Sequence, residues 1–348
     1  MKKAALIILF ALVSLTLCSC YDSKDIDEMV YVVAIGVDEA EGENTKFTLQ
    51  LALPLNISGG VETSFDTEQG SAPLNNISIS ESDIYTAIDK INMNISKEIN
   101  ISHCKLIVFS KDAAEGGLER YKSILTDDKN LRPNTYIAVC NGDASDYLNA
   151  VSSPHELNPA RYYDLMFEKG HSAYSSAVYL KNIYSPSQLT APLVSSSDDN
   201  TQKSGTALFK DLKMTATLSP DETLYFKMLN GSFTNANIRF PDGQMLSVHQ
   251  SKAPKVKLDI QSKSAYITLN LYGQKSSGGN KSANILSDNA KKYIANSCGN
   301  IIKKSLAENT DVLGIKNYTR KFFLTQQAFD DYAFNSQYKN FKIEVSVK

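Results

Sequence analysis

One cysteine close to the N-terminus lies in a sequence that favours covalent modification. Residues 17–20 read LCSC, and Leu17 is the last residue of an apolar run of 14 that begins after Lys2 and Lys3. A run of this length is typical of a signal peptide, because a helix that spans a bilayer needs about 20 residues. Leucine at −3, small residues at −2 and −1 and cysteine at +1 match the bacterial lipobox, in which the thiol is diacylated before cleavage. We therefore expect a signal peptide over 1–19 and a lipidated Cys20 at the start of the mature chain.

Two other interpretations of this leader are open. Cys18 is a second acceptor, but Leu17 would be its −1 residue, where a small side chain is preferred. The leader can also be a retained transmembrane anchor, although its apolar run is short for that role. Two or more acyl chains hold a protein stably on a membrane, and no later segment reaches 18 consecutive apolar residues. The sequence therefore predicts a protein that is anchored to a membrane and does not span it.

The side chains that commonly carry catalysis are scattered along the chain. No H-E-x-x-H, C-x-x-C, G-x-S-x-G or calcium-loop pattern occurs. His103 and Cys104 are adjacent, but neighbours on an extended chain point to opposite faces and cannot bond each other. The acidic pairs at 25–27 and 127–128 are typical of solvated residues, and Gly116-Gly117 is typical of a turn. The histidines have no ligand-spaced neighbours: His103, His155, His171 and His249. We therefore expect no catalytic residue, no metal site and no cofactor.

The composition is that of an ordinary globular protein. Hydrophobic residues make up 42% of the chain and charged residues 21%, and the length suits two or three domains. Loss of the two leader lysines changes the formal net charge from −2 to −4, and no run of lysine or arginine occurs. This charge balance argues against a nucleic-acid partner.

Three cysteines are left once Cys18 is removed and Cys20 is acylated. They are Cys104, Cys140 and Cys298. An odd number cannot all pair within one chain, so the protein is not a disulfide scaffold. Cys104 and Cys140 border predicted strands, and a disulfide between them is the alternative to our expectation of small buried thiols.

The first part of the mature chain alternates strand and helix patterns. Residues 29–38 and 46–54 predict a β-hairpin, and the polar stretch 54–80 predicts a long loop. Isoleucines then recur at helical spacing: Ile84, Ile88, Ile91, Ile95 and Ile99. Strand, helix, strand and helix follow at 105–110, 116–125, 135–140 and 143–151. This order predicts an α/β layer with at least two parallel neighbouring strands.

The second part of the chain has a different pattern. Residues 160–185 look helical, and the polar stretch 192–205 is the strongest linker candidate. A hairpin is expected over 205–218, and Ser219 with Pro220 and Glu222 marks a helix start. Two antiparallel strands, a long amphipathic helix and a last strand complete the pattern at 255–260, 265–273, 283–308 and 341–347.

These elements predict a multi-domain α+β or mixed α/β fold. We expect an N-terminal mixed α/β region over 20–200, with room for two subdomains. A C-terminal α+β domain over 201–348 would then combine an antiparallel-rich sheet with the long helix.

Four stretches of the chain follow, in order, the motifs of one known family. The mature start has Cys, an aromatic residue, Asp, a basic-acidic pair and Ile, and then a strand that ends in an Ile-Gly-Asp type turn; these are Cys20, Tyr21, Asp22, Lys24, Asp25, Ile26, Ile35, Gly36 and Asp38. The stretches 102–139, 205–223 and 306–323 follow, the last with Asp311 and Gly314 in place. In these features the chain resembles the Ger(x)C family of spore germination lipoproteins. Tryptophan is absent, so the family's tryptophans are replaced, by Tyr21 and by Phe329 or Tyr332.

This resemblance implies a function without catalysis. It implies a C subunit of a nutrient germinant receptor, required for triggering spore germination through protein–protein contacts. The subunit would be tethered by lipid to the outer face of the spore inner membrane, beside membrane-embedded A and B subunits. Whether it touches the germinant stays open. Two alternatives from the residues alone are a solute-binding lipoprotein of a transporter and an anchored hydrolase.

Overall fold

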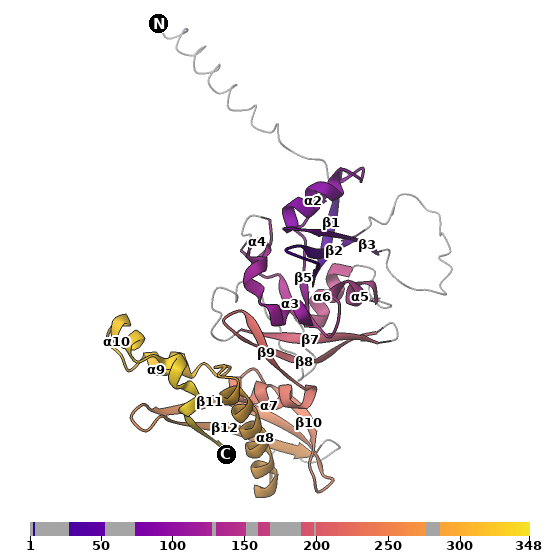
Figure 1. The fold of residues 1–348 in the computed structure, drawn as a ribbon. Coiled ribbons are helices and arrows are strands. Elements are labelled where there is room, and N and C mark those ends of the chain that lie inside the picture. The colour runs from indigo at the N-terminus through magenta and orange to yellow at the C-terminus, as the bar shows by residue number, and fades with distance from the viewer. Residues whose placement is uncertain are drawn as a thin grey trace.

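The protein has two domains that meet along one pair of strands (Figure 1). A computed structural model describes Lys3 and residues 28–52, 74–126, 130–150, 159–167, 189–197, 200–275 and 286–348. Cys20 lies outside these residues, as do the acidic pairs at 25–27 and 127–128, His155, His171 and most of 160–185. Within the described part of the chain, no helix is both long enough and apolar enough to cross a membrane.

A mixed sheet forms the N-terminal domain. Its described strands are β1 (Met29–Glu39), β2 (Thr45–Ala52), β3 (Leu74–Glu81), β4 (Glu98–Asn100), β5 (Leu106–Ser110), β6 (Tyr136–Cys140), β7 (Thr190–Ser197), β8 (Asn200–Lys210) and β9 (Lys213–Leu218). The order is β3-β2-β1-β5-β6-β7-β8-β9, and β4 pairs with the start of β1. Strands β1, β5, β6 and β7 are parallel neighbours, which confirms the predicted parallel layer.

Helices cover both faces of this sheet. On one face lie α2 (Ile84–Asn92), α3 (Lys111–Gly116), the short helix η2 (Leu118–Tyr121) and α4 (Lys122–Leu125). On the other lie α5 (Ala144–Ala150) and α6 (Pro159–Phe167). The central strands are therefore buried on both sides and read as continuous apolar runs, such as 106–109 and 136–140.

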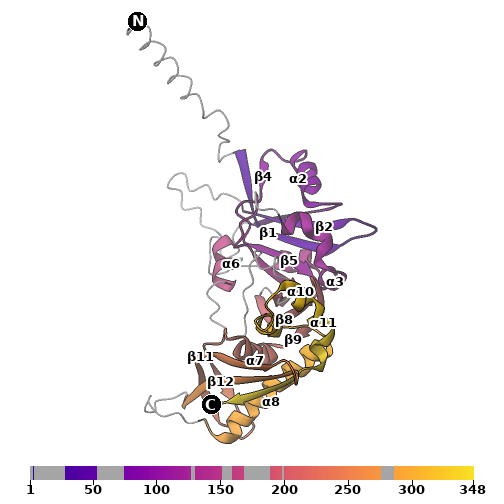
Figure 2. The ribbon, with the colours of Figure 1, turned by 90° about the vertical axis from the view of Figure 1, so that its left-hand side faces the viewer.

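The C-terminal domain is a second, smaller sheet with helices on one face (Figure 2). Its strands are β10 (Asn235–Arg239), β11 (Met245–Asp259), β12 (Ser264–Lys275) and β13 (Lys342–Val347), in that order. The first three are antiparallel, and β13 pairs parallel to β12. Two helices, α7 (Pro220–Asn230) and α8 (Asp288–Ala307), cover the inner face. The short helices α9 (Ile315–Arg320), α10 (Gln326–Asp331), α11 (Phe334–Gln337) and η5 (Tyr338–Asn340) lie between α8 and β13.

The two domains share strands β8 and β9, which we call the shared strand pair. Ala207 and Phe209 of β8 belong to the N-terminal core, whereas Leu208 between them belongs to the C-terminal core. In β9, Met214 faces the first core and Leu218 the second. Because successive side chains of a strand point to opposite faces, one strand pair supplies both cores.

Three details differ from the sequence-based expectations. The expected loop at 54–80 is wrong over its last residues, because Ile77 and Ile79 of β3 pack against the N-terminal core. The isoleucine stripe does not form one helix: α2 ends at Asn92, whose side chain accepts the N–H of Ile99, and Ile99 then pairs with β1. The expected linker at 192–205 is instead a hairpin, in which the polar ends of β7 and β8 pair with each other.

The capping signal of the C-terminal domain is confirmed. The Ser219 side chain accepts the N–H of Glu222, and the Glu222 carboxylate accepts the N–H of Ser219 at 2.8 Å. Pro220 occupies the first turn, and Gly231 ends the helix in the left-handed conformation. These residues satisfy the free backbone groups at both ends of α7, the helix that packs on the shared strand pair.

Candidate functional site

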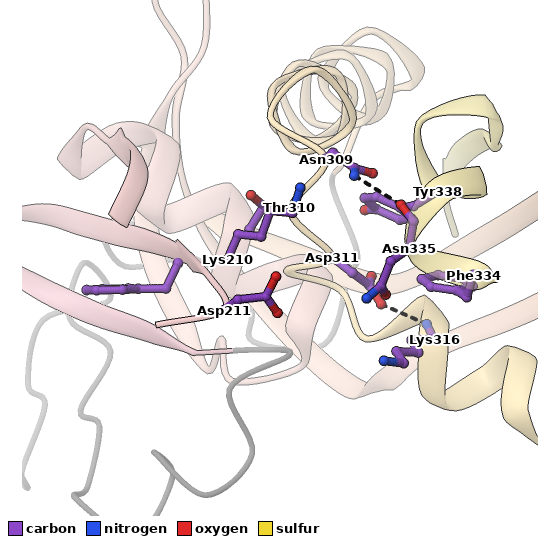
Figure 3. A pocket seen from close by; sticks show the side chains of 10 residues that line it. Lys210, Asp211, Asn309, Thr310, Asp311, Lys316, Phe334, Asn335 and Tyr338 are labelled. Carbon is purple, nitrogen blue, oxygen red and sulfur yellow. Dashed lines mark hydrogen bonds between the residues drawn. The ribbon is translucent and has the colours of Figure 1, made fainter. Parts of the chain in front are cut away.

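A small polar hollow lies where the two domains meet, and we call it the junction hollow (Figure 3). It is a small hollow, with a cavity volume of about 40 Å³, and it opens to solvent. One side is formed by the end of β8 and the β8–β9 turn, and the other by the segment after α8, the start of α9, α11 and η5. The lining residues are Phe209, Lys210, Asp211, Asn309, Thr310, Asp311, Lys316, Phe334, Asn335 and Tyr338.

The first wall of the hollow is a tight turn with unusual backbone. Asp211 and Leu212 both have positive φ angles, 49° and 65°. Residues other than glycine adopt such angles at a cost of about 1 kcal/mol or more. The turn is held by the N-terminal domain, because the carbonyl of Leu212 accepts the N–H of Leu118 at 2.9 Å. Lys210 and Asp211 are thereby presented toward the C-terminal domain (Figure 3).

The second wall is organised by Asp311. Its carboxylate accepts the backbone N–H groups of Ile315 at 2.9 Å and Lys316 at 2.7 Å, so it caps the start of α9. Burial raises the pKa of Asp311 to about 6, and the two N–H donors only partly offset this effect. Behind it, the Tyr338 hydroxyl contacts the Ser305 hydroxyl at 2.8 Å, and the Ser305 hydroxyl donates to the carbonyl of Thr310.

A few polar contacts join the two walls. The hydroxyl groups of Thr215 and Thr310 lie 3.1 Å apart. The Lys304 ammonium donates to the carbonyl of Thr217 at 2.5 Å and lies 3.3 Å from the Glu222 carboxylate. These contacts tie β9 to α7, α8 and the segment after α8. The hollow itself is lined by charges of both signs from both domains, Lys210 and Asp211 on one side and Asp311 and Lys316 on the other. They offer no activated nucleophile.

A second buried carboxylate, that of Asp38, gives the Ile-Gly-Asp motif of β1 a structural role. The buried Asp38 carboxylate accepts the N–H groups of Ala144 at 2.5 Å and Ser145 at 3.0 Å, at the start of α5. Burial raises the pKa of Asp38 despite these two bonds. Gly36 lies under the same helix: a Cβ there would come within 3.1 Å of Leu148 and 3.2 Å of Ala144. Gly36 and Asp38 therefore dock α5 onto β1, and we assign them a structural role.

The candidate chemistry groups of the sequence are not brought together. Cys104, Cys140 and Cys298 are free and buried, which agrees with the expectation of buried thiols and not with a Cys104–Cys140 disulfide. Burial raises the pKa of Cys104 and of Cys298 to about 12, so both thiols are protonated at neutral pH. The exposed ring of His103 packs against Tyr31, with ring centroids 4.6 Å apart. Among the described residues, no group of three or more His, Cys, Asp or Glu side chains is arranged to hold a metal ion.

Sequence inspection missed the junction hollow. Its residues come from three separate stretches, 209–211, 309–316 and 334–338, and none carries a chemical pattern of its own. The available signal was indirect: Asp311 and Gly314 were matched as family positions, and Asp311 proves to be the residue that caps α9.

Comparisons with known proteins agree with this architecture. Residues 22–195 match the family model described as "Spore germination protein N-terminal domain", and residues 204–348 match "Spore germination B3/ GerAC like, C-terminal". The crystal structure of the GerBC protein superposes with a TM-score of 0.53 and 17% identity, over 90% of this chain and 96% of that one. This likeness confirms the α+β fold with two domains.

Curated relatives point in the same direction. Spore germination protein KC of Bacillus subtilis (strain 168) is 24% identical over 178 residues, which are 51% of this chain and only 43% of that relative. Spore germination protein B3 of the same strain is 21% identical over 74% of this chain and 70% of its own. Spore germination protein GerQC of Bacillus cereus is 21% identical over 90% of this chain and 89% of its own. Since the two domain models match successive parts of the chain, it belongs to the Ger(x)C family of spore germination proteins.

Proposed function

We propose that this protein is a lipid-anchored, non-enzymatic subunit of a nutrient germinant receptor. The observation that carries the proposal is the match of both family models, in order, over residues 22–195 and 204–348. In this proposal the subunit triggers spore germination through contacts with two membrane-embedded subunits at the outer face of the spore inner membrane.

Two observations support the proposed anchor at Cys20: the leader sequence and the short distance in sequence to the first strand. Cys20 precedes the first residue of β1, Met29, by nine positions, and an extended chain of that length reaches at most about 30 Å. An acyl group on Cys20 would therefore keep the start of β1, with β4 paired beside it, near the membrane. Confinement to the membrane plane raises the effective concentration of neighbouring subunits, so individual contacts can be weak.

The non-enzymatic role is supported by the environment of the candidate nucleophiles. Cys104 and Cys298 are buried, and burial raises the pKa of each to about 12, whereas a reactive cysteine needs a lowered pKa and an exposed sulfur. The carboxylates of Asp38 and Asp311 are occupied by backbone N–H groups of α5 and α9. These groups therefore stabilise the fold.

A substitution of Cys20 tests the anchor and the role together. We expect Cys20→Ala to move the protein from the membrane fraction to the soluble fraction of spores and to abolish nutrient-triggered germination. Circular dichroism and the thermal midpoint of the purified ectodomain should stay unchanged. Cys18→Ala is the matched control: it removes the other leader cysteine, keeps a small residue at −2, and should leave retention and germination intact. Normal germination with a fully soluble Cys20→Ala protein would refute the proposal.

A further inference from the structure

The outer face of the C-terminal sheet gathers positive charge. Side chains on this face alternate with the buried residues of β12, and helices α7 and α8 cover the opposite face. Its basic and acidic members are all exposed: Arg239, Lys252, Lys255, Lys257, Lys342 and Lys348 against Asp259 and Glu344. We call this surface the outer sheet face. It carries four more positive than negative charges in a chain whose formal net charge is −2.

The strand register brings these residues together. Lys257 lies opposite Tyr266 and Lys255 opposite Thr268 in the β11–β12 ladder, and Tyr266 lies opposite Glu344 in the next ladder. Residues directly opposite each other share one face of a sheet. No basic run is visible in the sequence because the lysines are two residues apart within a strand and are collected from separate strands.

The positive charge of this face is available to a partner. Among the residues that the structure describes, the ion pairs involve other lysines and arginines, and none includes a basic side chain of the outer sheet face. Helix α2 of the N-terminal domain lies at the far end of the described molecule from this sheet in both views, and β4 lies beside it in Figure 2 (Figures 1 and 2). A proposed anchor before β1 would therefore hold the membrane away from the outer sheet face.

Aromatic rings lie in the middle of this charged surface. Tyr266 is 48% exposed, a large fraction for a tyrosine within a sheet. The rings of His249 and Tyr272 stack at 5.0 Å with an interplanar angle of 8°, and the Ser247 hydroxyl lies 3.1 Å from Nε2 of His249. Tyrosines in the centre with charges around them are typical of a protein–protein interface. With strands about 4.8 Å apart and about 3.4 Å per residue, the face covers on the order of 500 Å², more than half of one side of a standard interface.

We propose that the outer sheet face docks an acidic surface of a protein partner within the same membrane assembly. The inference rests on the proposed function for the location of the partner. Asp259 and Glu344 favour a protein over a nucleic acid or an anionic bilayer, because both carboxylates would repel phosphate groups but can pair with basic residues of a protein. The six basic side chains supply the complementary charge for the acidic residues of that partner.

Site-specific photo-crosslinking in spores tests this contact with the full chain. A benzophenone amino acid at position 266 should crosslink one protein of the membrane fraction, through a peptide of net negative charge. The same amino acid at position 292, an exposed position on α8, should not crosslink that protein. The double substitution Lys255→Glu/Lys257→Glu should lower the yield at least tenfold, and high salt should lower the wild-type yield. The matched control is Lys292→Glu/Lys303→Glu, which makes the same charge change on α8 and should leave the yield unchanged.

Several results would overturn the inference. These are a yield at 266 no greater than at 292, a yield that the Lys255→Glu/Lys257→Glu change leaves intact, and a crosslink to lipid or to nucleic acid. The proposed function is tested separately by Cys20→Ala. If that variant loses germination while Lys255→Glu/Lys257→Glu crosslinks and germinates normally, the docking inference fails and the proposed function stands. If deletion of the whole chain leaves germination normal, the proposed function fails, and the crosslink at 266 still reports on the docking surface.

Discussion

Replacement of Gly205 by alanine should destabilise both domains at once. Gly205 lies at a register break in the β7–β8 ladder, has φ of +146°, and is buried. A Cβ at this position would lie 1.9 Å from the carbonyl oxygen of Leu218, a backbone atom of the neighbouring strand. The backbone conformation alone costs an alanine about 1–3 kcal/mol. Separation of the shared strand pair costs about 1 kcal/mol for each lost hydrogen bond. We therefore expect the free energy of unfolding to fall by about 3–5 kcal/mol.

A second glycine provides the control for Gly205→Ala. Gly243 has φ of +82°, but a Cβ there would meet nothing within 4 Å. Gly243→Ala therefore has the backbone cost without the steric conflict, about 1–2 kcal/mol. Thermal unfolding of the mature ectodomain, followed by circular dichroism, should show a midpoint lower by about 6–10 °C for Gly205→Ala and by about 2–4 °C for Gly243→Ala. Equal shifts in the two variants would refute the argument that the close approach to Leu218 requires glycine.

Three further perturbations address single features. Burial raises the pKa of the Asp311 carboxyl to about 6, so this carboxyl holds a proton more tightly in the folded state than in the unfolded state. The protonated carboxyl therefore stabilises the fold at low pH, and this stabilisation is lost as pH rises from about 4 to 6. The wild type should therefore lose stability relative to Asp311→Asn over that range in urea titrations; parallel curves for the two proteins would contradict this. Gly36→Ala should lower the free energy of unfolding by about 1–3 kcal/mol by pushing α5 away from β1. The control is Gly299→Ala in α8, whose Cβ meets nothing within 4 Å and which needs no positive φ; no loss in Gly36→Ala would argue against the docking role. A thiol reagent at mildly alkaline pH should label no described cysteine of the folded Cys20→Ala protein and three after unfolding, and fast labelling of the native protein would contradict the burial of Cys104, Cys140 and Cys298.

Local patterns predicted most elements of this fold because local physical rules decide them. The Ser219–Glu222 capping box and the parallel strands 106–110 and 136–140 follow from capping chemistry and from continuous apolar runs. Errors arose where pairing with a distant strand overrides periodicity. Ile99 fits a helical stripe but is held in a strand by β1, and the serines of 195–197 look like a linker but pair with β8.

The candidate site was harder to predict than the fold. The junction hollow and the outer sheet face both depend on the relative placement of segments that are distant in sequence, such as Lys257 and Lys342 or Asp211 and Asp311. Spacing along one segment contains no information of that kind. The expected acylation of Cys20 is different, because a lipobox is a contiguous signal that an enzyme reads in an extended chain.

The shared strand pair has a mechanical consequence. A continuous hydrogen-bonded ladder runs from β1 through β5, β6 and β7 to β8. On β8, the side chain of Leu208 belongs to the C-terminal core. With the anchor proposed before β1, a tilt or pull at the membrane would pass along this hydrogen-bonded backbone to the C-terminal domain. A small displacement at the first strand would then become a larger one at the distal end.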